Sequence, residues 1–189
     1  MKPKLGFALC GSFCTHAQAL NVMRELSANY ELVPILSFAA GETDTRFGTA
    51  AALKEMLRGI SGREPIVTVR EAEKLGPSEP LDLLLICPCT GNTAAKLACG
   101  ITDTPVTMAA KAHLRCDRPL LLALASNDAL SGNLVNLGKL MQRKHVFFVP
   151  MRQDDVLKKP HSLVADFAEC ARCVEALREE KQIRPLFLS

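Results

Sequence analysis

The sequence predicts an α/β protein with a three-layer, Rossmann-like architecture, a doubly wound parallel sheet of about six strands. Short apolar runs alternate along the chain with segments in which apolar residues recur at helical spacing. The runs at residues 4–10, 81–87 and 120–125 are continuously apolar, which is typical of strands covered by helices on both faces. Because the composition does not change along the 189 residues, we expect residues 1–189 to form a single domain.

Each element is predicted from its own pattern. Strands are expected at residues 4–10, 32–38, 66–69, 81–87, 120–125 and 146–149. Helices are expected at about 15–29, 50–59, 93–99, 105–116 and 133–143, with a C-terminal helix at about 162–182. Ser61-Gly62 is expected to end the second helix. Strand–helix–strand units of this kind imply right-handed crossovers and one parallel sheet.

Composition excludes several classes of partner. A net charge of +3, one Tyr and no Trp argue against a nucleic-acid-binding surface. No apolar run reaches the roughly 18 residues that a membrane-spanning helix needs, and residues 1–4 lead into a strand pattern without a secretory signal. We therefore expect a cytoplasmic protein with neither nucleic acid nor membrane as a partner. Six basic residues form either a solvated face or a site for an anionic substrate: Lys139, Arg143, Lys144, Arg152, Lys158 and Lys159.

Eight cysteines raise the question of a metal or a disulfide. Disulfides are rare in the cytoplasm, and the pair Cys170 and Cys173 lacks the second ligand pair of a zinc site. We expect these two thiols to pack inside an amphipathic helix, and we expect no metal. Cys10, Cys87 and Cys89 fall at predicted strand ends, so packing and a cofactor-lining or redox role both stay open for them.

The loop after the first strand is suited to a phosphate. Ligands of open parallel sheets bind beyond the carboxyl ends of the strands, and this loop holds Gly11, which permits close approach of the backbone, with the hydroxyls of Ser12 and Thr15. The first amides of the following helix add to this set. The alternative is an ordinary helix cap. His16 falls in the first turn of this helix, but the four histidines form no recognisable catalytic arrangement.

The segment 88–96, after the most apolar strand, is dense in hydroxyl, amide and amine groups. Thr90, Asn92 and Thr93 can bind a phosphate or a ring carbonyl, because each offers hydrogen-bonding groups. The alternative is that these residues only cap the helix that follows.

Two more loops complete the predicted site. Ser126 and Asn127 follow the fifth strand, and the loop 41–48 contains Arg46, which either clamps a carboxylate or pairs with an acidic neighbour on the surface. Because the carboxyl ends of parallel strands meet at one edge of a sheet, the loops that start at residues 11, 88 and 126 are expected to line one hollow.

The segment Pro88-Cys89-Thr90-Gly91-Asn92-Thr93, with Lys96 and Gly100-Ile101-Thr102-Asp103 after it, resembles the PASANT motif and GIADN-like tail of the flavoprotein family of homo-oligomeric flavin-containing cysteine decarboxylases. Gly11-Ser12 resembles the family's FMN phosphate loop, and Asn127 is similar to the asparagine of its PxMN motif. The resemblance implies FMN as cofactor and a homo-oligomer. It implies that these residues line the flavin site: Gly11, Ser12, Ser37, Pro88, Thr90, Asn92, Thr93 and Ser126.

The resemblance extends over nearly the whole chain to one sporulation-linked branch of the family. It implies that the chain acts with a partner subunit, which binds NAD(P), to oxidise a dihydrodipicolinate-type intermediate of the lysine pathway to dipicolinate. The compartment implied is the cytoplasm of the mother cell in a spore-forming bacterium. Arg46, Asn127 and Lys111 are the candidate catalytic residues, expected to hold the two carboxylates of this small substrate.

The chain departs from the family pattern at three places. No histidine lies between Phe38 and Gly59, where the cysteine decarboxylases carry one, Thr104 replaces the asparagine of GIADN, and Ser126 replaces the methionine of PxMN. These departures weigh against decarboxylation by the family route. Two alternatives stay open beside the oxidoreductase subunit. They are an FMN-dependent decarboxylase of a cysteine-containing substrate and a non-catalytic subunit that stabilises its partner.

Overall fold

The computed structural model describes residues 2–189, and over that range it contains a seven-stranded sheet. The strands are β1 (Lys4–Leu9), β2 (Glu31–Leu36), β3 (Leu83–Thr90), β4 (Leu120–Ser126), β5 (Val146–Phe148), β6 (Met151–Arg152) and β7 (Leu163–Ala165). The sheet order is β2-β1-β3-β4-β7-β6, and β5 also pairs with β4. β1 to β5 pair in parallel, as predicted, whereas β7 is antiparallel to both β4 and β6.

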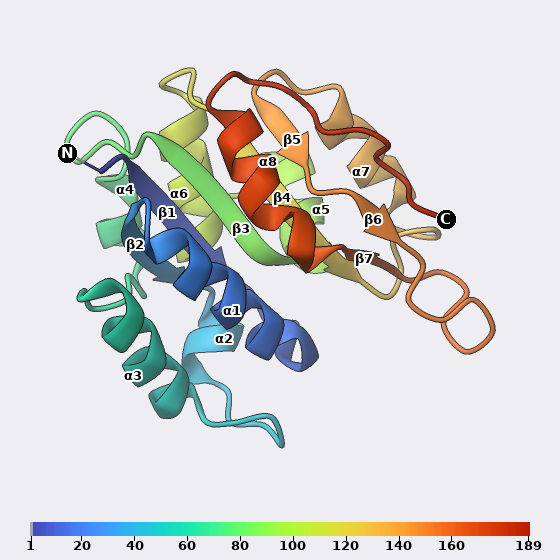
Figure 1. Cartoon of the computed structure of the whole chain (residues 1–189), viewed down its shortest axis with the longest axis horizontal. Helices are drawn as coiled ribbons and strands as arrows, with labels where there is room; N and C mark the ends of the chain where they lie inside the picture. The colour runs from blue at the N-terminus through green and yellow to red at the C-terminus, as the bar shows by residue number, and fades with distance from the viewer. Residues whose placement is uncertain (1) are drawn as a thin grey trace.

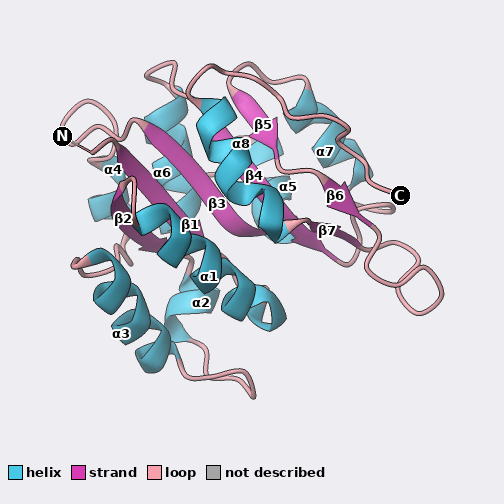
Figure 2. Cartoon of the chain, in the orientation of Figure 1, coloured by secondary structure: helices cyan, strands magenta, loops and turns pink. Residues whose placement is uncertain are grey.

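Helices cover both faces of the sheet and make it the middle of three layers (Figures 1 and 2). The α-helices are α1 (His16–Ser27), α2 (Phe38–Glu42), α3 (Ala50–Ser61), α4 (Val69–Glu73), α5 (Gly91–Cys99), α6 (Pro105–Leu114), α7 (Leu134–Met141) and α8 (Cys170–Leu177). Two short 3₁₀ helices, η1 (Phe13–Thr15) and η2 (Phe167–Glu169), precede α1 and α8. One buried apolar cluster joins the sheet to α1, α3 and α8, and a second joins it to α4, α5, α6 and α7. The predicted three-layer α/β class is confirmed.

Two predicted elements are wrong. Residues 66–69 do not form a strand, because only Ile66 pairs with Ile35 and Val69 already begins α4. The C-terminal helix expected at about 162–182 covers only 170–177, and its expected first turn is the strand β7. β5 pairs with only the first half of β4, so the end of β4 would otherwise have an unpaired edge, which β7 covers. Helical periodicity in the sequence carries no information about that edge.

The strand order places a topological switch point between β1 and β3. From β1 the chain passes to β2, which lies on one side of β1 in the sheet, whereas β3 lies on the other side. The connections that follow the adjacent strands β1 and β3 therefore run in opposite directions. No helix in the described chain is both long and apolar enough to cross a lipid bilayer. Because of the switch point, a ligand site is expected at one edge of the sheet, at the carboxyl ends of β1, β3 and β4.

His113 joins α6 to the start of β4 and makes stability depend on pH. Its ring is fully buried, and Nε2 donates to the Pro119 carbonyl oxygen at 2.9 Å. Burial lowers the pKa of His113 to about 4, from about 6.5 in the unfolded chain. Between these two pH values the unfolded chain binds a proton on this ring and the folded chain does not. We expect this group to stabilise the fold fully above about pH 6.5 and to lose about 3 kcal/mol as the pH falls to about 4. Denaturant unfolding at a series of pH values measures this loss.

The matched control is His113→Gln, which cannot ionise. This variant should show a shallower fall in the free energy of unfolding between about pH 6.5 and pH 4 than the parent chain. Equal slopes for the two proteins would contradict the assignment.

Candidate functional site

The loops after β1 and β3 are joined directly at the switch point. The Cys10 amide donates to the Pro88 carbonyl oxygen at 3.2 Å, and the Thr93 hydroxyl donates to the Cys10 Sγ atom at 3.2 Å. Cys10 is fully buried there, and this burial raises the pKa of its thiol to about 11. The thiol is therefore protonated at neutral pH and is a packing and hydrogen-bonding group rather than a nucleophile.

The loop after β1 keeps several polar groups unused. The Ser12 side chain makes no capping bond to η1, although its carbonyl oxygen accepts from both the amide and the hydroxyl of Thr15. Within residues 2–189 the amides of Gly11 and Phe13 donate to no acceptor. One hydroxyl and two amides are thus free at the start of a helix, which is the donor set that a phosphate requires.

The loop after β3 divides its polar groups between structure and solvent. Thr90 is the N-cap of α5 and accepts from the Thr93 amide at 3.3 Å, so the capping alternative is correct for Thr90. Thr93 is buried, and its hydroxyl is committed to Cys10. Asn92 is exposed, and its side chain makes no hydrogen bond within the described chain. Of the three predicted ligands in this loop, Asn92 has the free amide.

The loop after β4 is held by a carboxylate. Asp128 accepts from the Ser126 hydroxyl at 2.5 Å and from the Asn133 side-chain amide at 2.8 Å, and these bonds hold its pKa below the usual range. A Cβ added to Gly91 would lie 2.4 Å from Ser126 Oγ and 2.7 Å from Asp128 Oδ1. The loops after β3 and β4 therefore touch, and Asn127 lies exposed between two anchored neighbours.

Ser37 also reaches this edge of the sheet. Its amide donates to the Leu9 carbonyl oxygen at 3.0 Å, and its side chain caps α2 by accepting from the Ala40 amide. A Cβ added to Gly11 would lie 3.0 Å from the Cβ of Ala39, so α2 packs closely on the loop after β1. The loops starting at residues 11, 88 and 126 are thus linked by contacts at one edge of the sheet, and the end of β2 joins them.

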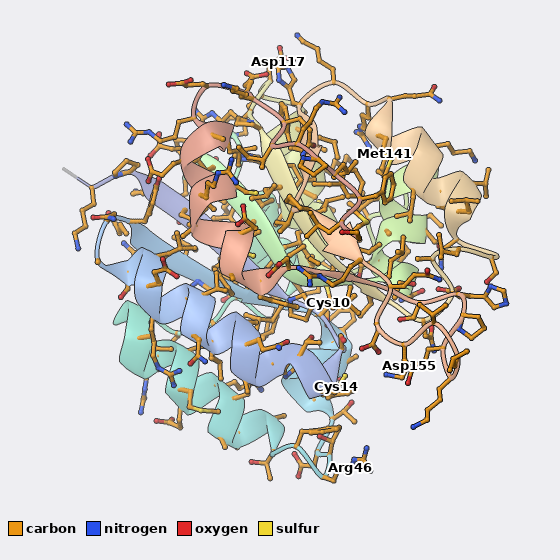
Figure 3. The ribbon with its side chains drawn as sticks, turned by 45° about the vertical axis from the view of Figure 1, so that its right-hand side comes forward. Cys10, Cys14, Arg46, Asp117, Met141 and Asp155 are labelled. Atoms are coloured by element: carbon orange, nitrogen blue, oxygen red, sulfur yellow. The ribbon has the colours of Figure 1, made fainter. Side chains whose placement is uncertain are left out.

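Two predicted residues lie elsewhere. Arg46 is exposed in a turn, with its guanidinium 4.8 Å from the Phe47 ring centroid, and no described carboxylate pairs with it. Figure 3 shows Arg46 at the outer end of its loop, away from Cys10. Lys111 is exposed on α6. The carbonyl oxygen of its neighbour Ala112 lies against Gly76, in the turn before β3, so this part of α6 is at the amino ends of the strands. Within this chain, neither residue joins the converging loops.

The cysteines, the basic residues of the C-terminal part and His16 each have a defined place in the structure. Cys170 and Cys173 pack in the core as expected, and Cys87 and Cys89 are also buried. The late basic residues are dispersed in separate contacts, such as Lys144 with Asp117 and Arg152 with Asp166, which favours the solvated face. His16, which spacing alone left without a role, has Nε2 at 2.8 Å from the Cys10 carbonyl oxygen, beside the loop after β1.

Comparison with known proteins identifies the family of the chain. The flavoprotein family matches residues 1–179, and the chain belongs to this family. The chain is 40% identical over 186 residues to the B subunit of dipicolinate synthase from Bacillus subtilis (strain 168), a match that covers 98% of this chain and 93% of that protein.

Solved structures give the same result for the fold. The crystal structure of the dipicolinate synthase B subunit from Bacillus halodurans is similar with a TM-score of 0.91 and 34% identity, covering 100% of this chain and 99% of that one. The FMN-dependent cysteine decarboxylase SpaF shares the fold with a TM-score of 0.69 and 21% identity, over 94% of this chain and 96% of that one. The family expected from the PASANT-like segment is therefore confirmed.

Gly91 tests how tightly the loops after β3 and β4 are docked. In Gly91→Ala the new methyl group would collide with Ser126 and Asp128, and we expect a loss of about 1–3 kcal/mol in the free energy of unfolding. The control is Gly138→Ala in α7, where nothing lies within 4 Å of the added Cβ and helix propensity favours alanine by up to about 1 kcal/mol. Urea unfolding of both variants distinguishes them, and a neutral Gly91→Ala would show that the loops are not in close contact.

Proposed function

We propose that this protein is the B-type subunit of a dipicolinate synthase, acting with an A-type subunit in the cytoplasm of the mother cell. The observation that carries the proposal is the similarity to dipicolinate synthase B subunits along nearly the full length of both chains, in sequence and in structure. The second support is the set of free donors in the loop after β1, beside the switch point, which matches an anionic ligand.

In the proposed reaction a dihydrodipicolinate-type substrate loses two hydrogens to become dipicolinate. One leaves as a hydride to NAD(P)⁺ on the A-type subunit, and the other leaves as a proton. We propose that this chain binds and orients the substrate beside its crevice, with Asn127 and Asn92 as exposed amide groups on adjacent loops. Arg46 and Lys111 could act on the same substrate only across a contact between subunits, which fits the homo-oligomer expected of the family.

FMN is the proposed cofactor of the crevice, and the residues present fit it. The phosphate would take the Ser12 hydroxyl and the amides of Gly11 and Phe13, which have no acceptor within residues 2–189. Ser37 and Ser126 lie buried at the neighbouring strand ends, and Asn92 offers both a donor and an acceptor for a ring edge. When bound, FMN supplies a flat two-electron redox centre.

Flavin uptake by the purified chain tests the cofactor. The unmodified chain should bind FMN one to one, seen as a shift in the flavin absorption bands and quenching of its fluorescence. Ser12→Ala should weaken the affinity at least tenfold, since a hydrogen bond to a charged group is worth about 1.5–3 kcal/mol. Ser78→Ala, at an exposed position in the turn before β3, is the control and should bind normally. A chain that takes up no FMN would remove the cofactor and leave only the subunit role.

Dipicolinate formation by the reconstituted pair tests the function. This chain and the A-type subunit together, with NAD(P)⁺ and freshly generated substrate, should form dipicolinate faster than the A-type subunit alone. Asn92→Ala should lower the rate at least tenfold, because it removes an unpaired amide from the crevice. Asn29→Ala, at an exposed position just before β2 on the opposite edge of the sheet, is the control.

Full activity with Asn92→Ala would instead indicate a stabilising subunit whose crevice is not used. Carbon dioxide release from a cysteine-containing substrate would indicate the decarboxylase. These two results separate the alternatives from the proposed oxidoreductase subunit.

A further inference from the structure

A cavity lies beside the phosphate loop, between α1, the segment 43–49 and α3. Its volume is about 380 Å³, which is in the range of small-molecule sites in proteins. Its apolar wall includes Phe13, Leu20, Phe47, Leu53 and Met56. Phe47 and Met56 are 55% and 41% exposed, so water meets large apolar surface at this mouth. A ligand with a flat apolar body would cover that surface.

The lining of the cavity carries a positive charge and no negative one. Arg24 is the only formally charged side chain in its lining, and the nearby Asp44 carboxylate is engaged by the Ala50 amide at 2.9 Å. Thr43, Thr45 and Thr49 add hydroxyl-bearing side chains along the opposite wall. A cation with neutral donors and no competing acid is complementary to an anionic ligand.

Arg24 is positioned toward the cavity rather than tied to the surface. Its Nη1 donates to the Asn21 side-chain oxygen at 2.8 Å, one turn nearer the start of α1, as expected for side chains that lean toward a helix N-terminus. Asn21 itself lines the cavity, and no described carboxylate pairs with Arg24. Most of the five guanidinium hydrogens are therefore available to a ligand.

His16 marks the inner end of the same wall. Nε2 lies 2.8 Å from the Cys10 carbonyl oxygen, which can only accept, so Nε2 carries the hydrogen and Nδ1 is an acceptor. Burial lowers the pKa of His16, which keeps the ring neutral at neutral pH. Arg24 lies eight residues later, about 12 Å along the helix axis before its side chain reaches back. The wall thus presents a cation at one end and a neutral acceptor at the other.

We propose that this cavity binds a small carboxylate with a flat apolar ring, the carboxylate on Arg24, the ring against Phe13 and Phe47, and a hydrogen-bond donor of the ligand on His16. The assignment of that ligand to a ring dicarboxylate of the dipicolinate type rests on the proposed function. Arg24 lines this cavity, whereas Arg46, in the segment 43–49, stacks on the Phe47 ring and does not line it.

The test is calorimetric titration of the full-length chain, without flavin and without divalent cations, with pyridine-2,6-dicarboxylate. The uncharged analogue pyridine-2,6-dimethanol is titrated in parallel. We expect saturable one-to-one binding of the dicarboxylate only. Arg24→Gln should weaken it at least tenfold, whereas Arg70→Gln, at an exposed arginine on α4 that does not line the cavity, should leave the Kd within twofold. Thermal unfolding shows whether both variants keep the fold.

Absence of saturable binding to the unmodified chain would overturn the inference, as would an unchanged Kd in Arg24→Gln. Titration of the same preparations with FMN separates this inference from the proposed cofactor. Dicarboxylate binding without flavin uptake supports the carboxylate site and removes the flavin. Flavin uptake without dicarboxylate binding removes the carboxylate site and leaves the flavin crevice in place.

Discussion

The contact between the ends of β1 and β3 is the constraint on which the candidate site depends. The Cys10 amide and the Pro88 carbonyl oxygen form a hydrogen bond at the point where the two strands separate, and the Thr93 hydroxyl adds a second link through the Cys10 sulfur. Both partners are buried among continuous apolar strands, where an unpaired polar group would be costly. The two loops that follow are therefore fixed relative to each other by the core itself.

From that junction the other loops are placed by close packing. Gly91 touches the Ser126–Asp128 pair, and Gly11 touches Ala39, so the lack of a side chain at two positions lets neighbouring loops approach. Asp128 is itself fixed by two hydrogen bonds. A rigid edge of this kind suits a cofactor, because preorganised donors do not need to be ordered when the ligand binds.

The polar residues of the site fall into two groups with different tasks. Thr90, Thr93 and Ser37 use their side chains to cap helices or to bond to Cys10, so they hold the converging loops in place. Ser12 and Asn92 make no such bonds within the described chain and remain available to a ligand. Residue type alone does not separate the groups, since a threonine hydroxyl serves either purpose. The separation depends on which backbone amides lie within reach after folding.

The sequence by itself determined the α/β class, the positions of the main parallel strands along the chain and the loops that carry polar groups, because apolar periodicity and glycine positions are local properties. It also identified the family, through the segment that starts at Pro88. Only the tertiary structure decided that residues 163–165 pair with the open end of β4, that Lys111 lies away from the converging loops, and that Arg24 rather than Arg46 lines the cavity. Each of these depends on contacts between segments distant in the chain, which no local pattern encodes.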